Sequence, residues 1–81
     1  MNILVVSIYD DGYSWSVALL KEDGTIVRFQ DNKEIEDIIT SFVDHEHSHL
    51  HLISYLSDYR IDKVIWCEMG NIDFYDNGLT S

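Results

Sequence analysis

This sequence contains no proline, one cysteine and five basic residues in a chain of 81. The single cysteine, Cys67, excludes an internal disulfide framework and fits a reducing compartment, so we expect a cytoplasmic protein and a buried structural thiol. The sequence has no run of about 18 apolar residues, which excludes a membrane-spanning helix. Its first residues also lack the basic segment of a signal peptide. We therefore expect one domain over residues 1–81 with no membrane association.

The shortage of bases leaves a large negative charge, because 15 acidic residues give a formal net charge of -10. Nucleic acids and anionic membranes repel such a chain, so we expect neither as a direct partner. Solubility alone requires a net charge of only about 2 to 8 in magnitude for a small domain. The excess favours a protein partner with a basic surface.

The apolar pattern of the first 30 residues predicts three strands. Residues 3–9 are apolar at nearly every position, which is typical of a central strand covered on both faces. Residues 14–20 alternate between apolar and smaller or polar side chains, and residues 25–29 form a third apolar run. Gly24 supplies the positive φ that the tight connection between them requires. We expect these strands to form an antiparallel meander.

The middle of the chain predicts helix. Asp31 is expected as the N-cap, with Glu34 closing a capping box. An amphipathic stripe follows at helical spacing, formed by Ile35, Ile38, Ile39, Phe42 and Val43. A second stripe resumes at Leu50, Leu52, Ile53 and Leu56. Two helices with a break around residues 44–48 are favoured, and one long helix is the alternative.

The last third predicts one further strand, and the whole chain an α+β (or small α/β) fold. Residues 63–68 form the fourth strand, which we expect to lie parallel to the first. The helices then cover one face of the sheet. Residues 72–75 either add a short strand or lie against the sheet.

Four histidines alternate with other residues in residues 44–51. In a helix, His45 pairs with His49 and His47 with His51, one turn apart and on nearly opposite faces. Either pair could share zinc or nickel, and residues 45–49 satisfy the bare H-E-x-x-H pattern of catalytic zinc helices. A solvated helix junction is the simpler interpretation. We expect no cofactor and no tight metal site.

A second candidate metal site combines Asp10, Asp11 and Glu68. If the first and fourth strands are parallel neighbours, their carboxyl ends lie at one sheet edge, where two carboxylates could hold Mg²⁺ or Mn²⁺. The element order over roughly residues 1–68 resembles the first half of RNase H-like nucleases of the resolvase type. The resemblance implies an aspartate in the first strand, where this chain has Ser7, and a second carboxylate at Glu68. It therefore implies a scaffold without catalysis.

We predict a small acidic protein-binding module that is not an enzyme. In size, charge and lack of catalytic motifs it resembles the small inhibitors of phages or mobile elements. Such inhibitors bind a host nucleic-acid-binding or defence protein by charge mimicry. The alternatives are a homo-oligomeric structural subunit and a degenerate, metal-dependent hydrolase. The predicted partner-binding side chains are acids and aromatics, namely Glu34, Glu36, Asp37, Asp44, Trp15 and Tyr13.

Overall fold

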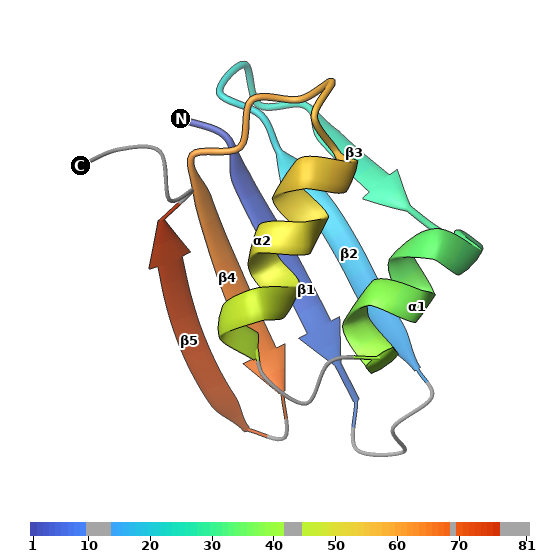
Figure 1. Cartoon of the computed structure of the whole chain (residues 1–81). Helices are drawn as coiled ribbons and strands as arrows, with labels where there is room; N and C mark the ends of the chain where they lie inside the picture. Colours follow the sequence, from blue (N-terminus) through green and yellow to red (C-terminus); the bar gives the residue numbers. More distant parts are fainter. Residues whose placement is uncertain (10–13, 42–44, 69, 77–81) are drawn as a thin grey trace.

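The computed structural model describes residues 1–9, 14–41, 45–68 and 70–76 (Figure 1). Tyr13, Asp44, Asp10 and Asp11 therefore lie outside the described residues, as do Phe42 and Val43 of the predicted helical stripe. The elements in chain order are β1 (Ile3–Ile8), β2 (Trp15–Leu20), β3 (Ile26–Phe29), α1 (Lys33–Ser41), α2 (His45–Tyr55), β4 (Lys63–Glu68) and β5 (Asn71–Asp76).

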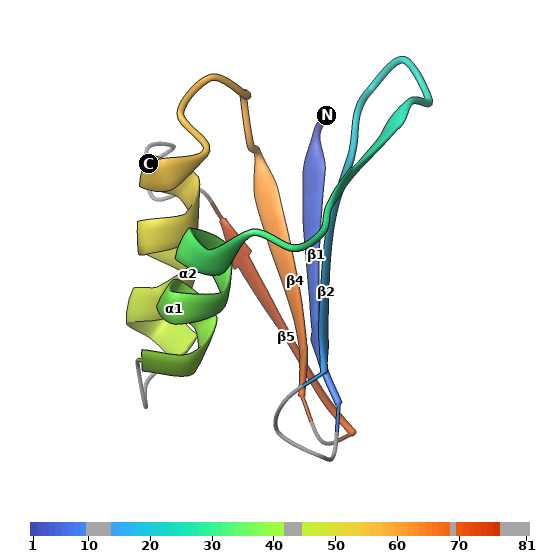
Figure 2. The same ribbon diagram turned by 90° about the vertical axis from the view of Figure 1, so that its right-hand side faces the viewer.

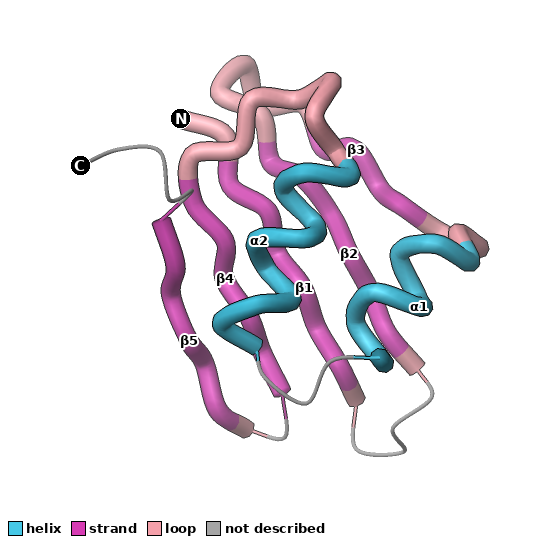
Figure 3. Tube along the Cα trace, viewed as in Figure 1, coloured by secondary structure: helices cyan, strands magenta, loops and turns pink. Residues whose placement is uncertain are grey.

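The strands form one mixed sheet of five strands in the order β3-β2-β1-β4-β5 (Figure 3). β1, β2 and β3 are antiparallel neighbours, which confirms the meander. β4 lies parallel to β1, which confirms the predicted crossover. Residues 71–76 form a fifth strand, β5, which is antiparallel to β4. Of the two alternatives for residues 72–75, the additional strand is therefore the one observed. The α+β fold class is confirmed.

Both helices lie on the same side of the sheet, and no described element covers the other side (Figure 2). The two helices belong to one connection, from β3 to β4, and a single crossover passes over one face. The prediction that β1 is central is confirmed. The prediction that β1 is covered on both faces is wrong for the described part of the chain. We call the uncovered side the open face.

The core lies between the helices and the sheet. Strand residues alternate between the two faces, so every second residue of each strand points toward the helices. The buried apolar side chains are Leu4, Val6, Val17, Leu19, Ile35, Ile39, Leu52, Leu56, Ile61, Val64 and Trp66. At one edge of this layer, the rings of Phe29 and Tyr59 meet edge to face with centroids 5.7 Å apart.

The N-terminus of α1 is capped by Asn32. The Ile35 N–H donates to Asn32 Oδ1 at 3.1 Å, and the Glu36 N–H donates to the Asn32 carbonyl at 3.0 Å. Asp31 stands one residue earlier with a φ of 54°, outside the helix. The prediction of Asp31 as the cap is wrong by one residue. With Asn32 as the cap, the third helical position is Ile35, which has no carboxylate, so no capping box forms.

The second helix begins earlier than predicted. α2 starts at His45, so residues 45–48 are helical and not part of a break. Ser48 and His49 are buried, whereas Leu50 is 43% exposed. The stripe that faces the core is therefore His49, Leu52, Ile53 and Leu56, at the helical spacing i, i+3, i+4 and i+7.

His49 takes an apolar position because its flat ring stacks on an aromatic side chain. The His49 and Tyr75 rings are nearly parallel, with centroids 4.1 Å apart. Tyr75 lies on β5, so this contact joins α2 to the edge of the sheet. The interpretation of residues 45–49 as a solvated junction is wrong for His49 and for its buried neighbour Ser48.

Asn2 joins three parts of the chain at the start of β1. Its backbone N–H donates to Asp62 Oδ2 at 2.9 Å, and its side-chain amide donates to the Arg60 carbonyl at 2.6 Å. Its Oδ1 accepts the Glu22 N–H at 2.8 Å. The Asn2 N–H bond, with the nearby Arg60 charge, lowers the pKa of Asp62 below its ordinary value of 3.8.

We expect this lowered pKa to make part of the stability depend on pH. A carboxyl whose folded pKa lies below its unfolded pKa stabilises the fold above the unfolded value, and the contribution disappears as pH falls through the folded value. An Asp62→Asn variant should be less stable than the native protein at pH 7, and the difference should shrink as pH falls below about 4. Urea unfolding at several pH values measures this difference. A difference that stays constant down to pH 2 would contradict it.

Candidate functional site

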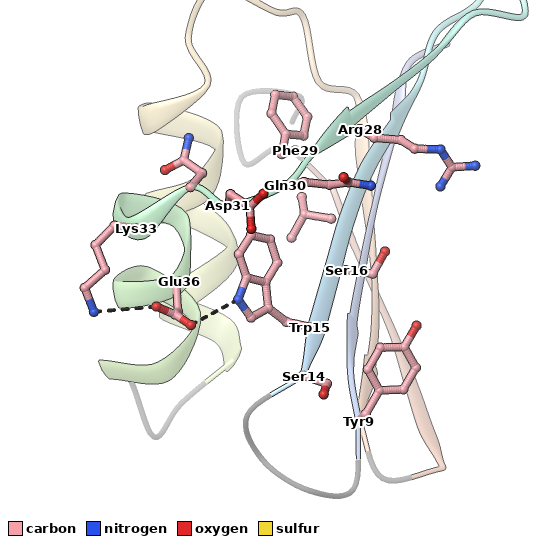
Figure 4. Close-up of a pocket in the computed structure, with 12 residues that line it drawn as sticks. Tyr9, Ser14, Trp15, Ser16, Arg28, Phe29, Gln30, Asp31, Lys33 and Glu36 are labelled. Atoms are coloured by element: carbon pink, nitrogen blue, oxygen red, sulfur yellow. Dashed lines mark hydrogen bonds and ion pairs between the residues drawn. The ribbon is translucent and has the colours of Figure 1, made fainter.

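A pocket forms where β2 extends beyond the end of β3. Phe29, the last residue of β3, pairs with Val17. Trp15 and Ser16, the first two residues of β2, therefore have no partner residue in β3. The chain then crosses from the sheet to α1 through residues 30–32. A cavity of about 690 Å³ lies between this sheet edge and the first turns of α1 (Figure 4). We call it the Trp15 pocket, because the Trp15 ring lies between β2 and α1 (Figure 4).

Trp15 and Glu36 meet in this pocket. The indole points from β2 toward α1, and its Nε1 donates to Glu36 Oε1 at 3.4 Å (Figure 4). Both side chains are half-buried. The structure thus brings together one aromatic and one acidic residue of the predicted partner-binding set, from elements that are separated by a strand in the sequence.

Lys33 neutralises part of the acidic surface of α1. Its Nζ lies 3.1 Å from Asp37 Oδ1 and 3.5 Å from Glu36 Oε2. The hydrogen bond to Asp37 and the charges of both carboxylates raise the pKa of Lys33. Lys33 itself is exposed, as are Glu34 and Asp37. Of the predicted acids of α1, Glu36 lines the pocket together with Lys33, whereas Glu34 and Asp37 lie exposed on the same helix.

The pocket has the chemistry to receive a cationic side chain. Asp31 and Glu36 supply carboxylates, and Trp15 supplies an indole ring. A guanidinium or ammonium group gains from both, through charge-assisted hydrogen bonds and through the negative face of the ring. Arg28 also lines the pocket, but its side chain points away from Trp15 on the far side of the sheet edge (Figure 4).

The candidate metal ligands named from the sequence do not come together among the described residues. His49 is buried against Tyr75, and Glu68 accepts a hydrogen bond from Trp66 Nε1 at 3.3 Å. Asp10 and the side chain of His45 lie outside the described part. Within that part, no group of three or more His, Cys, Asp or Glu side chains could hold a metal ion.

The carboxylate pair implied by the nuclease resemblance has no geometric support. β1 and β4 end at the same edge of the sheet, as expected, with Ile8 beside Glu68. Ser7 pairs with Cys67, so Ser7 lies on the open face while Glu68 lies on the helix-covered face with Trp66. The two matched positions therefore point to opposite sides of the sheet.

The open face is an exposed apolar surface that the sequence analysis did not predict. Cross-strand registers place Ile26, Leu20 and Ile3 in one row and Ala18, Val5, Ile65 and Phe74 in the next. Four of these apolar or neighbouring side chains are strongly exposed, namely Phe74 at 73%, Ile72 at 57%, Ile26 at 52% and Leu20 at 42%. The signal was present in the sequence, because residues 3–9 are apolar at positions that face both sides.

The open face also lacks the negative charge of the rest of the chain. Alternation along the strands places three charged residues on it: Arg28, Lys63 and Asp76. Two cations and one anion give this face a small positive charge, whereas the whole chain carries -10. The net negative charge thus lies entirely outside the strand residues of this face. Cys67 also lies on the open face. It is half-buried, whereas the sequence analysis predicted a buried thiol.

Neither described helix is long and apolar enough to cross a membrane. A comparison of this chain with protein-family models, with curated proteins and with solved structures finds no match.

Proposed function

We propose that this chain is a small acidic protein-binding module that engages a basic surface of a partner protein. One observation supports the proposal above the others: Trp15 Nε1 and Glu36 Oε1 meet, at 3.4 Å, in a pocket that Asp31 also lines. An arginine or lysine of the partner inserts between the indole and the carboxylates. The module acts by occupying that surface and not by catalysis.

The charge of the whole chain supports fast association with such a partner. A net charge of -10 on 81 residues creates a field that attracts basic surfaces over a distance of about one Debye length. The exposed acids of α1, Glu34 and Asp37, orient the approach, and the pocket then fixes the contact. A host nucleic-acid-binding or defence protein is the class of partner that presents a basic groove of this kind. Such partners place the module in the cytoplasm.

A charge-reversal experiment tests the location of this surface. The test variant carries Glu34→Lys, Glu36→Lys and Asp37→Lys on α1. The control variant carries Glu22→Lys, Asp23→Lys and Asp58→Lys, three exposed acids away from the pocket. Both variants undergo the same change in net charge. Each also loses local bonds, those of Glu36 and Asp37 with Trp15 and Lys33 in the test variant and those of Glu22 and Asp23 with Met1 and Thr25 in the control.

The probe is a labelled peptide of arginine residues, and stopped-flow fluorescence gives its association rate. We expect the test variant to bind about tenfold more slowly than the control variant, because local acids steer association. Equal rates for the two variants would contradict a site on α1, since bulk charge alone would then explain the binding.

The two tryptophans allow a direct reading of the pocket. Trp66 is 1% exposed and Trp15 is half-buried, and a Trp66→Phe background leaves Trp15 as the one tryptophan of the chain. We expect the peptide to change the Trp15 emission in this background, and Glu36→Gln to weaken the change. A Trp15 emission that is indifferent to saturating peptide would exclude the pocket as the contact.

A further inference from the structure

We propose that the open face of the sheet packs against the same face of a second copy of this chain. The exposed apolar residues of this interface and the Trp15–Glu36 contact belong to opposite faces of the sheet, because alternation along the strands places Trp15 on the helix-covered face. Arg28, at the edge of the open face, also lines the pocket. Phe74, Ile72, Ile26 and Leu20 supply its exposed apolar surface. The occupant is a second copy and not a basic protein, for reasons of charge, area and complementarity.

The charge distribution favours a second copy. Two chains of charge -10 repel each other unless their acids remain far apart. Packed sheets lie about 10 Å apart, and each helical layer then lies outside its own sheet. The acids of the two α1 helices are thus separated by more than the Debye length of about 8 Å at physiological ionic strength. A basic partner, by contrast, gains little on a face that holds Arg28 and Lys63 with one acid.

The area of the face suits a reversible dimer. Strands about 4.8 Å apart and residues about 3.3 Å apart give five strands a face of about 400 Å² in plan. The accessible area exceeds the plan area because side chains project from it, so two copies bury on the order of 1,000 Å² in total. That area is below the range of stable specific interfaces, which begins at about 1,200 Å², and is typical of weak, transient ones. We therefore expect a dimer that dissociates on dilution.

A two-fold arrangement also pairs the charges of the two copies. An axis parallel to the strands places β3 of one copy over β5 of the other, because these are the two edges of the sheet. Arg28 then lies over the second copy's Phe74 and near its Asp76, and each contact occurs twice. A cation above an aromatic ring and beside a carboxylate is favourable.

Single lysine substitutions test the interface. Phe74→Lys and Ile72→Lys change exposed positions on the open face, and Leu50→Lys is the matched control on the helical side. In sedimentation velocity experiments, we expect the native protein and the control to form dimers as concentration rises. The two open-face variants should dimerise at least about tenfold more weakly. Each substitution lowers the net negative charge of the chain, so weaker dimerisation cannot result from stronger repulsion between the two net charges.

Cys67 provides a second measurement on the unmodified protein. Its thiol lies on the open face beside Ser7 and Ile72, and it is the one cysteine of the chain. Dimerisation should cover it, so its rate of reaction with a thiol reagent should fall as protein concentration rises. A native protein that stays monomeric, with constant Cys67 reactivity, would overturn the proposal. So would a dimer that survives Phe74→Lys and Ile72→Lys, or one that Leu50→Lys disrupts equally.

Discussion

Ile39→Asp is expected to unfold the domain. Ile39 is 5% exposed in the apolar layer between α1 and the sheet, and an aspartate there buries a charge without a partner. Changes of this kind commonly cost more than about 4 kcal/mol, whereas a domain of this size has about 4 to 12 kcal/mol of stability. Circular dichroism should lose its folded signal at 25 °C or show a greatly lowered melting temperature.

Thr40→Asp is the control for this prediction. It introduces the same charge one residue later, at an exposed position of the same helix. Its effect should be about 1 kcal/mol or less, chiefly from an acid near the helix C-terminus and the lost bond from Thr40 Oγ1 to the Glu36 carbonyl. If the two variants melt at similar temperatures, α1 does not face the core through Ile39.

Trp66→Ala is expected to produce the second largest loss of stability. Trp66 is the largest fully buried side chain, and it stands on β4 in register with Val6 of β1. Truncation removes its apolar contacts and leaves a cavity, which costs about 3 to 5 kcal/mol for an aromatic residue in a core. Urea unfolding should show a much lower midpoint with a similar slope.

Trp66→Phe separates the packing of this side chain from its hydrogen bond. The phenyl ring retains much of the volume but lacks the Nε1 donor to Glu68 at 3.3 Å. We expect it to be markedly more stable than Trp66→Ala. A Trp66→Phe loss as large as that of Trp66→Ala would mean that the hydrogen bond, and not packing, is the dominant contribution.

The sheet and the first helix were predictable because their patterns are local. Alternation in residues 14–20, the turn at Gly24, whose φ is 91°, and the isoleucine stripe of α1 each specify one element. The parallel placement of β4 followed from the length of the connection between β3 and β4. These features require no knowledge of distant contacts.

The start of α2 and the two surfaces proposed for binding were less predictable because they depend on tertiary contacts. From the sequence alone, His49 is expected at the surface as a polar residue. Its burial depends on stacking with Tyr75 of β5, a distant contact. In the sequence, nothing distinguishes Glu36 from the other acids of α1. Its hydrogen bond with Trp15 of β2 is seen only in the structure. The open face required the sheet order, because Phe74 joins the row of Val5, and Ile72 the row of Ser7, only when β5 pairs with β4.

The structure separates two kinds of surface in one small domain. The acids of α1 and the Trp15–Glu36 contact lie on the side of the helices, whereas Phe74, Ile72, Ile26 and Leu20 are exposed on the open face. We infer that the first binds a basic partner and the second a further copy of the chain. In such a dimer both acidic sides point outward, so each remains accessible to a partner.

The most direct test is the response of the two interactions to salt, measured on the native protein. Sedimentation velocity at about 0.05 and 0.5 M NaCl, with and without the labelled arginine peptide, gives both binding constants. Salt screens the repulsion between two negative chains, so dimerisation should strengthen. It screens the attraction for the peptide, so that binding should weaken at least about tenfold. If both constants move in the same direction, the acids and the self-association surface are not separated as proposed.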